Sequence, residues 1–193
     1  MKLNEIEQIL FECKVGIAGA GGLGSNCAVS LVRAGLGKLI IADFDVVSKS
    51  NLNRQFYFSD QIGQKKVEAL AANLYRIKPN LQLQLVDKKL MAADIKQIFN
   101  DCDVIVEAFD DKAQKQMLIE AVIEHLPNKP LIVGSGMAGW GDNNSIKTDK
   151  IDNIYICGDK ISEVSDDMPP IGPRVGVVAN MQANQVLEIL LKK

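Results

Sequence analysis

Hydrophobic and polar positions follow two different periods along this chain, and the period changes every ten to twenty residues. Short apolar runs, rich in Val and Ile, predict strands that are covered on both faces. One run, at residues 81–86, alternates apolar and polar side chains, which predicts a strand with one face in water. Between these runs, apolar side chains recur every three or four residues, which predicts helices. The expected strands cover residues 14–19, 38–43, 81–86, 103–109 and 130–136, and the expected helices cover residues 3–12, 19–35, 63–79, 93–99 and 111–126.

This alternation of strands and helices predicts the α/β class: a Rossmann-like, mostly parallel sheet with helices on both faces. The pattern changes after residue 136. Residues 144–148 and 153–157 predict short antiparallel strands at a sheet edge, residues 158–174 a polar, Pro-rich surface loop, and residues 174–193 a last helix. We expect one domain, made of a leading helix (1–12), a nucleotide-binding core (13–136) and a C-terminal part with the edge strands, loop and helix (137–193).

The composition excludes several classes of function. With 193 residues, 47% hydrophobic and 24% charged, the chain has an ordinary globular composition. A net charge of −2 gives no basic field for a nucleic acid or an anionic membrane. No apolar run approaches the roughly 18 residues of a membrane span, and the first fourteen residues carry acids and lack the apolar core of a signal peptide. A cytoplasmic location is the expectation.

The cysteines do not form a metal-binding pattern. Cys13, Cys27, Cys102 and Cys157 are scattered, without a CxxC pair, and the single histidine, His125, has no nearby partner. Zinc is therefore not expected. We interpret them as reduced thiols that pack in the interior, and a reactive role stays open only for Cys157, which precedes Gly158 and an expected loop.

A glycine loop follows the first expected strand and opens the next helix. Residues 19–24 (GAGGLG) fit the GxGxxG pattern, and Asp43 lies 19 residues beyond Gly24. Gly19 permits the tight turn, Gly21 and Gly22 let the backbone approach a phosphate, and Gly24 packs the helix on the strand. Asp43 is placed to accept hydrogen bonds from ribose hydroxyls, and its charge disfavours NADP. The motif alone leaves NAD, FAD, S-adenosylmethionine and ATP open.

Charged side chains beyond this motif favour ATP. Arg54, with Asn51 and Gln55, follows the second strand, Lys66 begins the next helix, and Asp110 ends the fourth strand. Strand C-termini meet at one edge of a parallel sheet, so these groups should converge there. Hydride transfer does not need them, whereas attack at phosphorus needs cations and a Mg²⁺ carboxylate. The residues thus predict phosphoryl or nucleotidyl transfer.

Each of these residues also has a structural interpretation. Arg54 could anchor its own loop, Lys66 could be a solvated lysine, as Lys65 is expected to be, and Asp110 could cap the following helix, although Asp111 is the better cap. Asp45 and Lys49, in the same segment as Arg54, have no predicted role beyond a local ion pair.

Five segments together resemble the ThiF/MoeB/HesA family, bacterial enzymes related to ubiquitin-activating enzymes. The resemblance runs from about residue 14 to residue 190 and is closest to the short ThiF form, which adenylates the sulfur carrier protein ThiS. The segments that carry it are GAGGLGS, DFDVVSKSNLNRQ, GQKKVEA, FDD and PRVGVVANMQANQVLEILL.

The resemblance implies a reaction and its partners. An adenylyltransferase of this family uses ATP to adenylate the C-terminal glycine of a small ubiquitin-like sulfur carrier that ends in Gly-Gly, with release of pyrophosphate, here in thiamine biosynthesis. A sulfur donor protein then acts on the adenylate, and a homodimer is expected. Because residues 158–174 contain no Cys, the route is expected to be non-covalent. By match, Asp43 binds ribose, Asn51, Arg54, Gln55 and Lys66 hold the phosphates, and Asp110 ligates Mg²⁺.

Four alternatives stay open. The same chemistry could serve another carrier of the MoaD kind, or a carboxylate on a tRNA base, although the acidic balance disfavours RNA. A non-catalytic adaptor would need no Arg54, Lys66 and Asp110 together. An NAD-dependent dehydrogenase is the least favoured because of these phosphate-facing charges.

Overall fold

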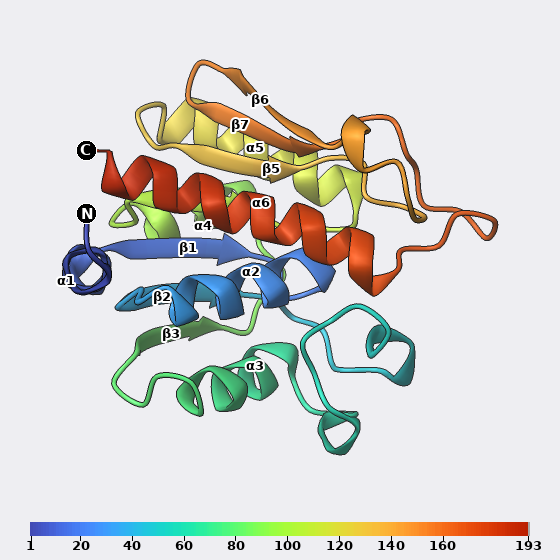
Figure 1. Ribbon diagram of the computed structural model, residues 1–193, viewed down its shortest axis with the longest axis horizontal. Helices are drawn as coiled ribbons and strands as arrows, with labels where there is room; N and C mark the ends of the chain where they lie inside the picture. The colour runs from blue at the N-terminus through green and yellow to red at the C-terminus, as the bar shows by residue number, and fades with distance from the viewer. Residues whose placement is uncertain (193) are drawn as a thin grey trace.

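A computed structural model describes residues 1–192, in which a seven-stranded sheet lies between two layers of helices (Figure 1). The strand order is β3-β2-β1-β4-β5-β7-β6, and all neighbours are parallel except β6 and β7. The predicted Rossmann-like class with an antiparallel edge is confirmed. The strands are β1 (Lys14–Ala18), β2 (Lys38–Ala42), β3 (Gln82–Val86), β4 (Val104–Glu107), β5 (Leu131–Gly134), β6 (Lys147–Ile151) and β7 (Ile154–Gly158).

Six α-helices cover the two faces of this sheet in the described part of the chain. One buried cluster joins the sheet to α1, α2, α3 and α6, and the other joins it to α4 and α5. Figure 1 shows α2 and α6 side by side in front of the strands, with α4 and α5 behind. The helices are α1 (Leu3–Glu12), α2 (Gly22–Arg33), α3 (Lys66–Tyr75), α4 (Ala92–Phe99), α5 (Lys112–His125) and α6 (Gly172–Leu191).

The structure differs from the predicted elements at α3, which begins three residues later and ends four residues earlier than the expected 63–79, and in the C-terminal part. Strand β6 begins at Lys147 instead of residue 144, because Asn143–Ser145 forms a 3-10 turn after Asp142, whose φ is 44°. Helix α6 begins at Gly172, two residues earlier than expected, with a proline in its first turn, where a missing N–H is tolerated. It ends at Leu191, and the last predicted helical residue, Lys193, lies outside the described residues.

The strand order reverses between β1 and β4, the two strands at the centre. β1 pairs with β2 on one side and with β4 on the other, so the chain leaves their C-terminal ends in opposite directions. In open α/β sheets such a switch point forms the ligand crevice. The glycine loop follows β1, Asp43 follows β2 and Asp110 follows β4. The expected site residues therefore start from three adjacent strand ends.

None of the four cysteines, all within the described residues, is part of a disulfide, and Cys27, Cys102 and Cys157 are buried as predicted. Burial raises the pKa of Cys102 to about 12 and also raises the pKa values of Cys27 and Cys157, so these thiols stay protonated. No three His, Cys, Asp or Glu side chains within residues 1–192 are grouped so that they could hold a metal ion. In the same range, no helix is both long and apolar enough to cross a membrane.

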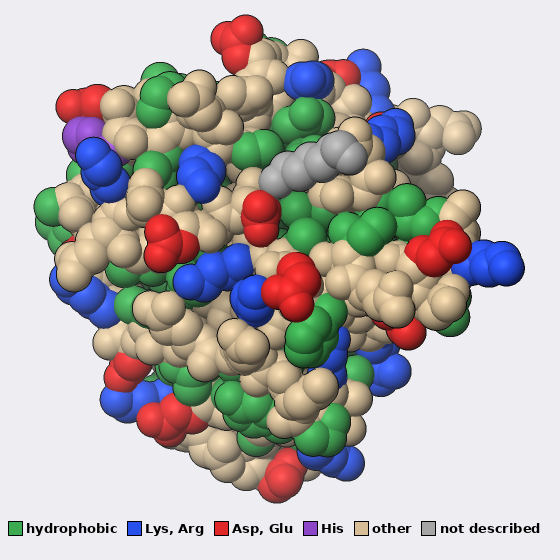
Figure 2. All heavy atoms as spheres, turned by 90° about the vertical axis from the view of Figure 1, so that its left-hand side faces the viewer, with side chains coloured by type: hydrophobic (Ala, Val, Ile, Leu, Met, Phe, Trp, Pro, Cys, Tyr) green, Lys and Arg blue, Asp and Glu red, His purple; other side chains and the backbone are tan. Residues whose placement is uncertain are grey.

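Charges of both signs are mixed on one face of the molecule. Figure 2 shows the side on which the strands begin, and there the Lys and Arg side chains alternate with Asp and Glu. On that face charges of both signs are interspersed, and no single-sign field is present of the kind that attracts nucleic acid.

Candidate active site

The glycine loop makes the turn from β1 into α2 that the sequence predicts. Gly19 has a φ of 103°, and a Cβ there would lie 2.6 Å from the carbonyl oxygen of Ala108. A Cβ on Gly24 would lie 1.8 Å from the carbonyl oxygen of Gly19, so the helix packs on the turn without space for a side chain. At Gly21, by contrast, the nearest atom to a Cβ is 3.8 Å away, on Gln55. No side chain caps α2, so its first N–H groups can bind an anion.

Asp43 faces this loop from the end of β2. One carboxylate oxygen accepts a hydrogen bond from the N–H of Ala20 (2.6 Å), and the other accepts from the N–H of Asp45 (2.8 Å). The side chain is half-buried. Each oxygen keeps a second lone pair, so the carboxylate is both fixed to the loop and able to accept from ribose hydroxyls.

Two polar residues at the start of α2 join the glycine loop to the segment after β2. The Ser25 hydroxyl donates to the carbonyl of Gly21 (2.6 Å) and accepts from the N–H of Phe56 (3.0 Å). The amide of Asn26 donates to the carbonyl of Arg54 (2.9 Å). Sequence reasoning missed both residues. The only available signal was a pair of polar residues on a helix that is otherwise largely buried.

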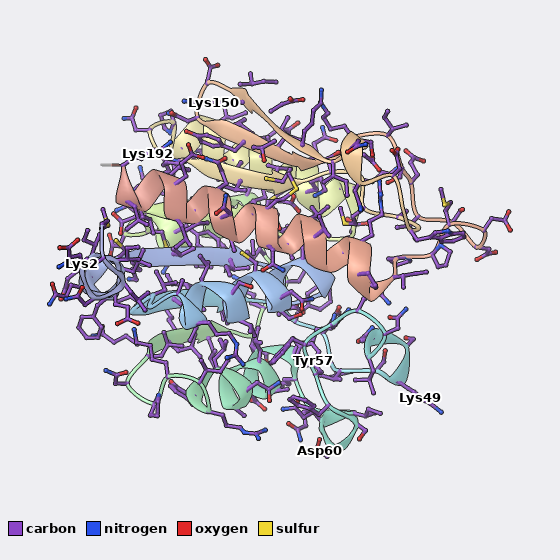
Figure 3. The ribbon with its side chains drawn as sticks, viewed as in Figure 1. Lys2, Lys49, Tyr57, Asp60, Lys150 and Lys192 are labelled. Atoms are coloured by element: carbon purple, nitrogen blue, oxygen red, sulfur yellow. The ribbon has the colours of Figure 1, made fainter. Side chains whose placement is uncertain are left out.

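Tyr57 was also missed, and it connects three parts of the site. It lies buried between the segment that follows β2 and the body of the fold (Figure 3), where its hydroxyl donates to the carbonyl of Ala20 (2.7 Å). The carbonyl of Lys66 lies 3.3 Å from the same hydroxyl. Burial, together with the charges of Asp43 and Asp45, raises the pKa of Tyr57, so the hydroxyl remains a donor at neutral pH.

Arg54 and Asn51 both take part in folding their own loop. Arg54 Nη1 donates to the carbonyl of Ser50 (3.1 Å) and to Asn53 Oδ1 (2.9 Å), and its Cγ would lie 3.6 Å from a Cβ on Gly22. The Asn51 side-chain oxygen accepts from the N–H of Ser48 (3.0 Å). The loop-anchoring interpretation of Arg54 therefore holds in part. The stem of Arg54 lies beside the start of α2, and the other guanidinium N–H groups make no hydrogen bond within residues 1–192, so they stay available to a ligand.

Gln55 contains an unsatisfied buried atom next to the glycine loop. Its side chain is 8% exposed, and Oε1 is buried without a hydrogen-bond partner among the described protein groups. Leaving such a group unpaired costs about 1–3 kcal/mol. A ligand donor such as a ribose hydroxyl would remove that cost, whereas phosphate oxygens are themselves acceptors, so a phosphate could be bound only by Nε2 of Gln55.

Lys66 is a buried cation and not a solvated lysine. It is 5% exposed, and Nζ donates to Asp45 Oδ2 at 2.8 Å. The expected pair of Asp45 with Lys49 is therefore wrong. The N–H of Lys66 donates to the carbonyl of Asp45 (2.9 Å), which brings Asp45 to the start of α3, whereas Lys49 begins a 3-10 turn and extends outward (Figure 3). The neighbouring Lys65 is exposed, as expected, and pairs with Asp87.

Within the described residues, the fold leaves the side chain of Asp110 unused, as it does that of Gln55. Asp110 is exposed at the end of β4, and within residues 1–192 its carboxylate makes no hydrogen bond or ion pair. Asp111 caps α5 instead, because its Oδ1 accepts from the N–H of Gln114 (2.8 Å). A single carboxylate fits Mg²⁺, which commonly takes one or two protein carboxylates together with phosphate oxygens.

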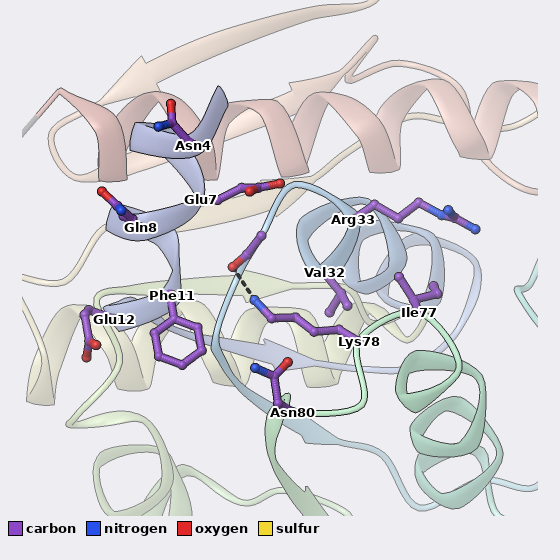
Figure 4. Close-up of a pocket in the computed structure, with 11 residues that line it drawn as sticks. Asn4, Glu7, Gln8, Phe11, Glu12, Val32, Arg33, Ile77, Lys78 and Asn80 are labelled. Carbon is purple, nitrogen blue, oxygen red and sulfur yellow. Dashed lines mark hydrogen bonds between the residues drawn. The ribbon is translucent and has the colours of Figure 1, made fainter. Parts of the chain in front are cut away.

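A cleft lies apart from these residues, at the opposite end of the strands. It has a volume of about 850 Å³ and opens between α1 and the C-terminal ends of α2 and α3 (Figure 4). At its base Lys78 Nζ donates to the carbonyls of Gly35 (2.6 Å) and Leu36 (3.1 Å) and lies 5.2 Å from the ring centroid of Phe11. This lysine satisfies carbonyls after a helix C-terminus, a structural role. The cleft is therefore not part of the candidate site.

Known proteins are similar to this chain in sequence and in fold. The model of the ThiF family matches residues 4–193. The chain is 30% identical to the sulfur carrier protein ThiS adenylyltransferase of Escherichia coli (strain K12) over 95% of this chain and 74% of that protein. It is 28% identical to the molybdopterin-synthase adenylyltransferase of the same organism, over 95% and 75%. It is 31% identical to the adenylyltransferase and sulfurtransferase MOCS3 of Caenorhabditis briggsae, of which it spans only 45%.

Among solved structures, the fold is similar to that of E. coli tRNA N6-threonylcarbamoyladenosine dehydratase, TcdA, in complex with AMP. The TM-score is 0.89, with 97% of this chain and 90% of that chain covered. The sequence identity is 19%, so this likeness concerns the fold alone.

Proposed function

This chain belongs to the ThiF family and is an adenylyltransferase, and we propose that it uses ATP and Mg²⁺ to adenylate the C-terminal glycine of a ThiS-like sulfur carrier in thiamine biosynthesis. The observation that carries the proposal is a pair of cations, Arg54 and Lys66, joined to the glycine loop through hydrogen bonds of Asn26 and Tyr57. An α-phosphorus bound there would meet positive charge from both side chains and from the start of α2.

The residues divide the work of such a reaction. A terminal carboxylate oxygen of the carrier attacks the α-phosphorus, the bond to the bridging oxygen breaks, and pyrophosphate leaves with its electron pair. No general base is required, because the carboxylate is already ionised at neutral pH. Asp43 would hold the ribose, while Asn51, Arg54, Gln55 and Lys66 would hold the phosphates. Asp110 would hold Mg²⁺, which supplies further charge neutralisation when bound.

A second observation supports a protein as the acceptor. Four apolar side chains, which we call the apolar tip, project from the loops after β5 and β7, with Trp140 69% and Ile161 84% exposed. These loops lie on the nucleotide side, because the amide of Asn53 donates to the carbonyl of Pro170 (3.3 Å). Exposed apolar groups of this kind mark protein-binding surfaces. The apolar tip consists of Trp140, Ile161, Val164 and Met168.

The same chemistry on a MoaD-like carrier is the second candidate. The chain is nearly as similar to the molybdopterin-synthase adenylyltransferase as to the ThiS enzyme, at 28% against 30% identity. In both cases a sulfur donor protein would take over the acyl-adenylate, and by family resemblance the enzyme would act as a homodimer in the cytoplasm.

Exchange of labelled pyrophosphate into ATP tests the proposal. The purified protein should catalyse exchange with ThiS-like carriers that end in Gly-Gly and not with the same carriers after the two glycines are removed. Faster exchange with a MoaD-like carrier would select the second candidate. Absence of exchange with every carrier, accompanied by reduction of NAD, would refute both.

A further inference from the structure

Arg174 is a buried cation that the proposed reaction does not use. It lies in the first turn of α6 and is 6% exposed. Nη2 donates to Asp159 Oδ2 at 2.6 Å and lies 3.4 Å from the hydroxyl of Ser145, while Nη1 donates to the carbonyl of Gly141. One guanidinium thus joins α6 to the loop after β5 and to the loop after β7.

Asp159 extends this connection into the loop that carries the apolar tip. Its Oδ1 accepts hydrogen bonds from the N–H groups of Ile161 and Ser162, both at 2.8 Å. The hydroxyl of Ser162 in turn accepts from the N–H of Ala138 (3.1 Å). Burial alone would raise the pKa of Asp159, but the hydrogen bonds from Ser162, Ile161 and Arg174 outweigh burial and lower it. The carboxylate of Asp159 therefore stays ionised at neutral pH.

The same turn of α6 packs directly on the nucleotide loops. A Cβ on Gly172 would lie 2.7 Å from the carbonyl oxygen of Asn53, so this turn touches the segment that contains the expected phosphate ligands. A Cβ on Gly22 would lie 2.8 Å from Cγ1 of Val175, so the turn also touches the first residue of α2. Arg174 sits between these two contacts, on a helix turn that reaches both halves of the site.

Stability alone does not explain this arrangement. A buried ion pair repays its desolvation only with excellent geometry, and apolar residues of similar volume are often as stable. Here Nε of Arg174 is buried without a partner among the described groups, which adds a cost. An ion pair of this kind is better suited to fixing one arrangement of the loops than to holding the fold together.

We propose that Arg174 is a positioning residue: through Asp159 it holds the apolar tip at a fixed place beside the nucleotide, so that the carrier tail reaches the α-phosphorus. The inference rests on the proposed function, because it assigns the apolar tip to the carrier. Arg174 touches neither substrate in this account. Its loss should weaken use of the carrier and leave ATP binding intact.

Three measurements on Arg174→Gln and Arg174→Lys test this. They are KM for the carrier in pyrophosphate exchange, Kd for ATP by calorimetry, and the rate of tryptic cleavage after the exposed Lys160 in the same loop. We expect Arg174→Gln to raise KM by about tenfold, with Kd for ATP within about twofold of the wild type. Cleavage after Lys160 should become faster in Arg174→Gln. In KM and in the cleavage rate, Arg174→Lys should lie between the wild type and Arg174→Gln, since a lysine keeps the charge but loses the planar guanidinium that donates two hydrogen bonds at once.

Several outcomes would overturn the proposal. An unchanged KM in Arg174→Gln does so, as does an equal loss of carrier use and ATP binding, which indicates a general structural role. If Arg174→Gln does not fold, Asp159→Asn replaces it, because an asparagine can keep the acceptor for Ile161 and Ser162. If the wild type shows no exchange with any carrier, the proposed function fails by itself. The cleavage and ATP measurements then still decide whether the pair holds the loop.

Discussion

The segment after β2 and the loops after β5 and β7 both extend beyond the C-terminal ends of the strands, but they are held in different ways. The first is joined to the glycine loop at several points, through Ser25, Asn26 and Tyr57. The loops of the second are joined to α6 through a buried pair, Arg174 and Asp159, and to each other through hydrogen bonds such as that from the N–H of Ala138 to Ser162, and their apolar side chains are exposed. A small ligand with fixed charges suits the first region, whereas a protein surface suits the second. Variants in each region should therefore fail in different ways.

Gly24→Ala should have the largest effect. The new Cβ would lie 1.8 Å from the carbonyl oxygen of Gly19, so the glycine loop must move. We expect a loss of about 3 kcal/mol in the free energy of unfolding, together with loss of ATP binding. Urea denaturation and calorimetry measure both. Gly176→Ala in α6 is the control, since no atom lies within 4 Å of its Cβ position, and it should be neutral or slightly stabilising.

Asp110→Ala and Asp111→Ala should separate catalysis from stability. The first removes the unused carboxylate and should lower the rate of pyrophosphate exchange on the order of 10³-fold with little change in unfolding. The second removes the cap of α5 and should cost about 1 kcal/mol while exchange continues. If Asp110→Ala unfolds the protein, that aspartate is structural and the Mg²⁺ assignment is wrong.

Lys66→Met should reduce exchange on the order of 10²-fold, because the variant loses the buried cation that we propose holds the phosphates. Its partner Asp45 is 47% exposed on its side chain, so water can solvate the unpaired carboxylate and stability should change little. Lys65→Met is the matched control and should stay within about twofold of the wild type, since its ion pair is exposed. Equal rates for the two variants would contradict a role for Lys66 at the phosphates.

Trp140→Ser tests the second region. It should raise KM for the carrier by about tenfold and leave Kd for ATP unchanged, because exposed aromatic side chains carry much of the binding energy at protein interfaces. Ile151→Ser, on β6 and 60% exposed, lies outside the apolar tip and should have no such effect. A similar rise in KM for both variants would mean that the carrier does not bind specifically to the apolar tip.

Asp159→Asn should raise KM for the carrier as Arg174→Gln does, because it breaks the same buried pair, and it should also have a smaller effect that is visible only in acid. The folded-state pKa of Asp159 is lowered from 3.8, so its stabilising contribution is present above that value and is lost as the pH falls below it. The free energy of unfolding of the variant should therefore fall less steeply below about pH 4 than that of the wild type. Identical slopes in pH-dependent denaturation would show that the pair does not stabilise the loop.

Sequence reasoning predicted most of the fold, and it named candidate site residues that follow three adjacent strand ends. The hydrophobic periods of strands and helices are set by residues that are close together in the sequence, so they can be recognised locally. The glycine loop and Asp43 can also be recognised locally, because they belong to one strand–loop–helix unit. Ser25, Tyr57 and Arg174 act through contacts with residues 31, 37 and 15 positions away, which no local pattern encodes. The start of β6 was misplaced because the turn at Asp142 requires a left-handed residue without the usual glycine.

The carrier itself provides the most direct test of the central claim. A ThiS-like carrier incubated with the enzyme, ATP and Mg²⁺, without a sulfur donor, should gain the mass of one adenylyl group at its C-terminal glycine. Intact-mass spectrometry measures this, and Asp110→Ala should prevent it. A carrier of unchanged mass, under conditions in which the wild-type enzyme binds ATP, would contradict the account.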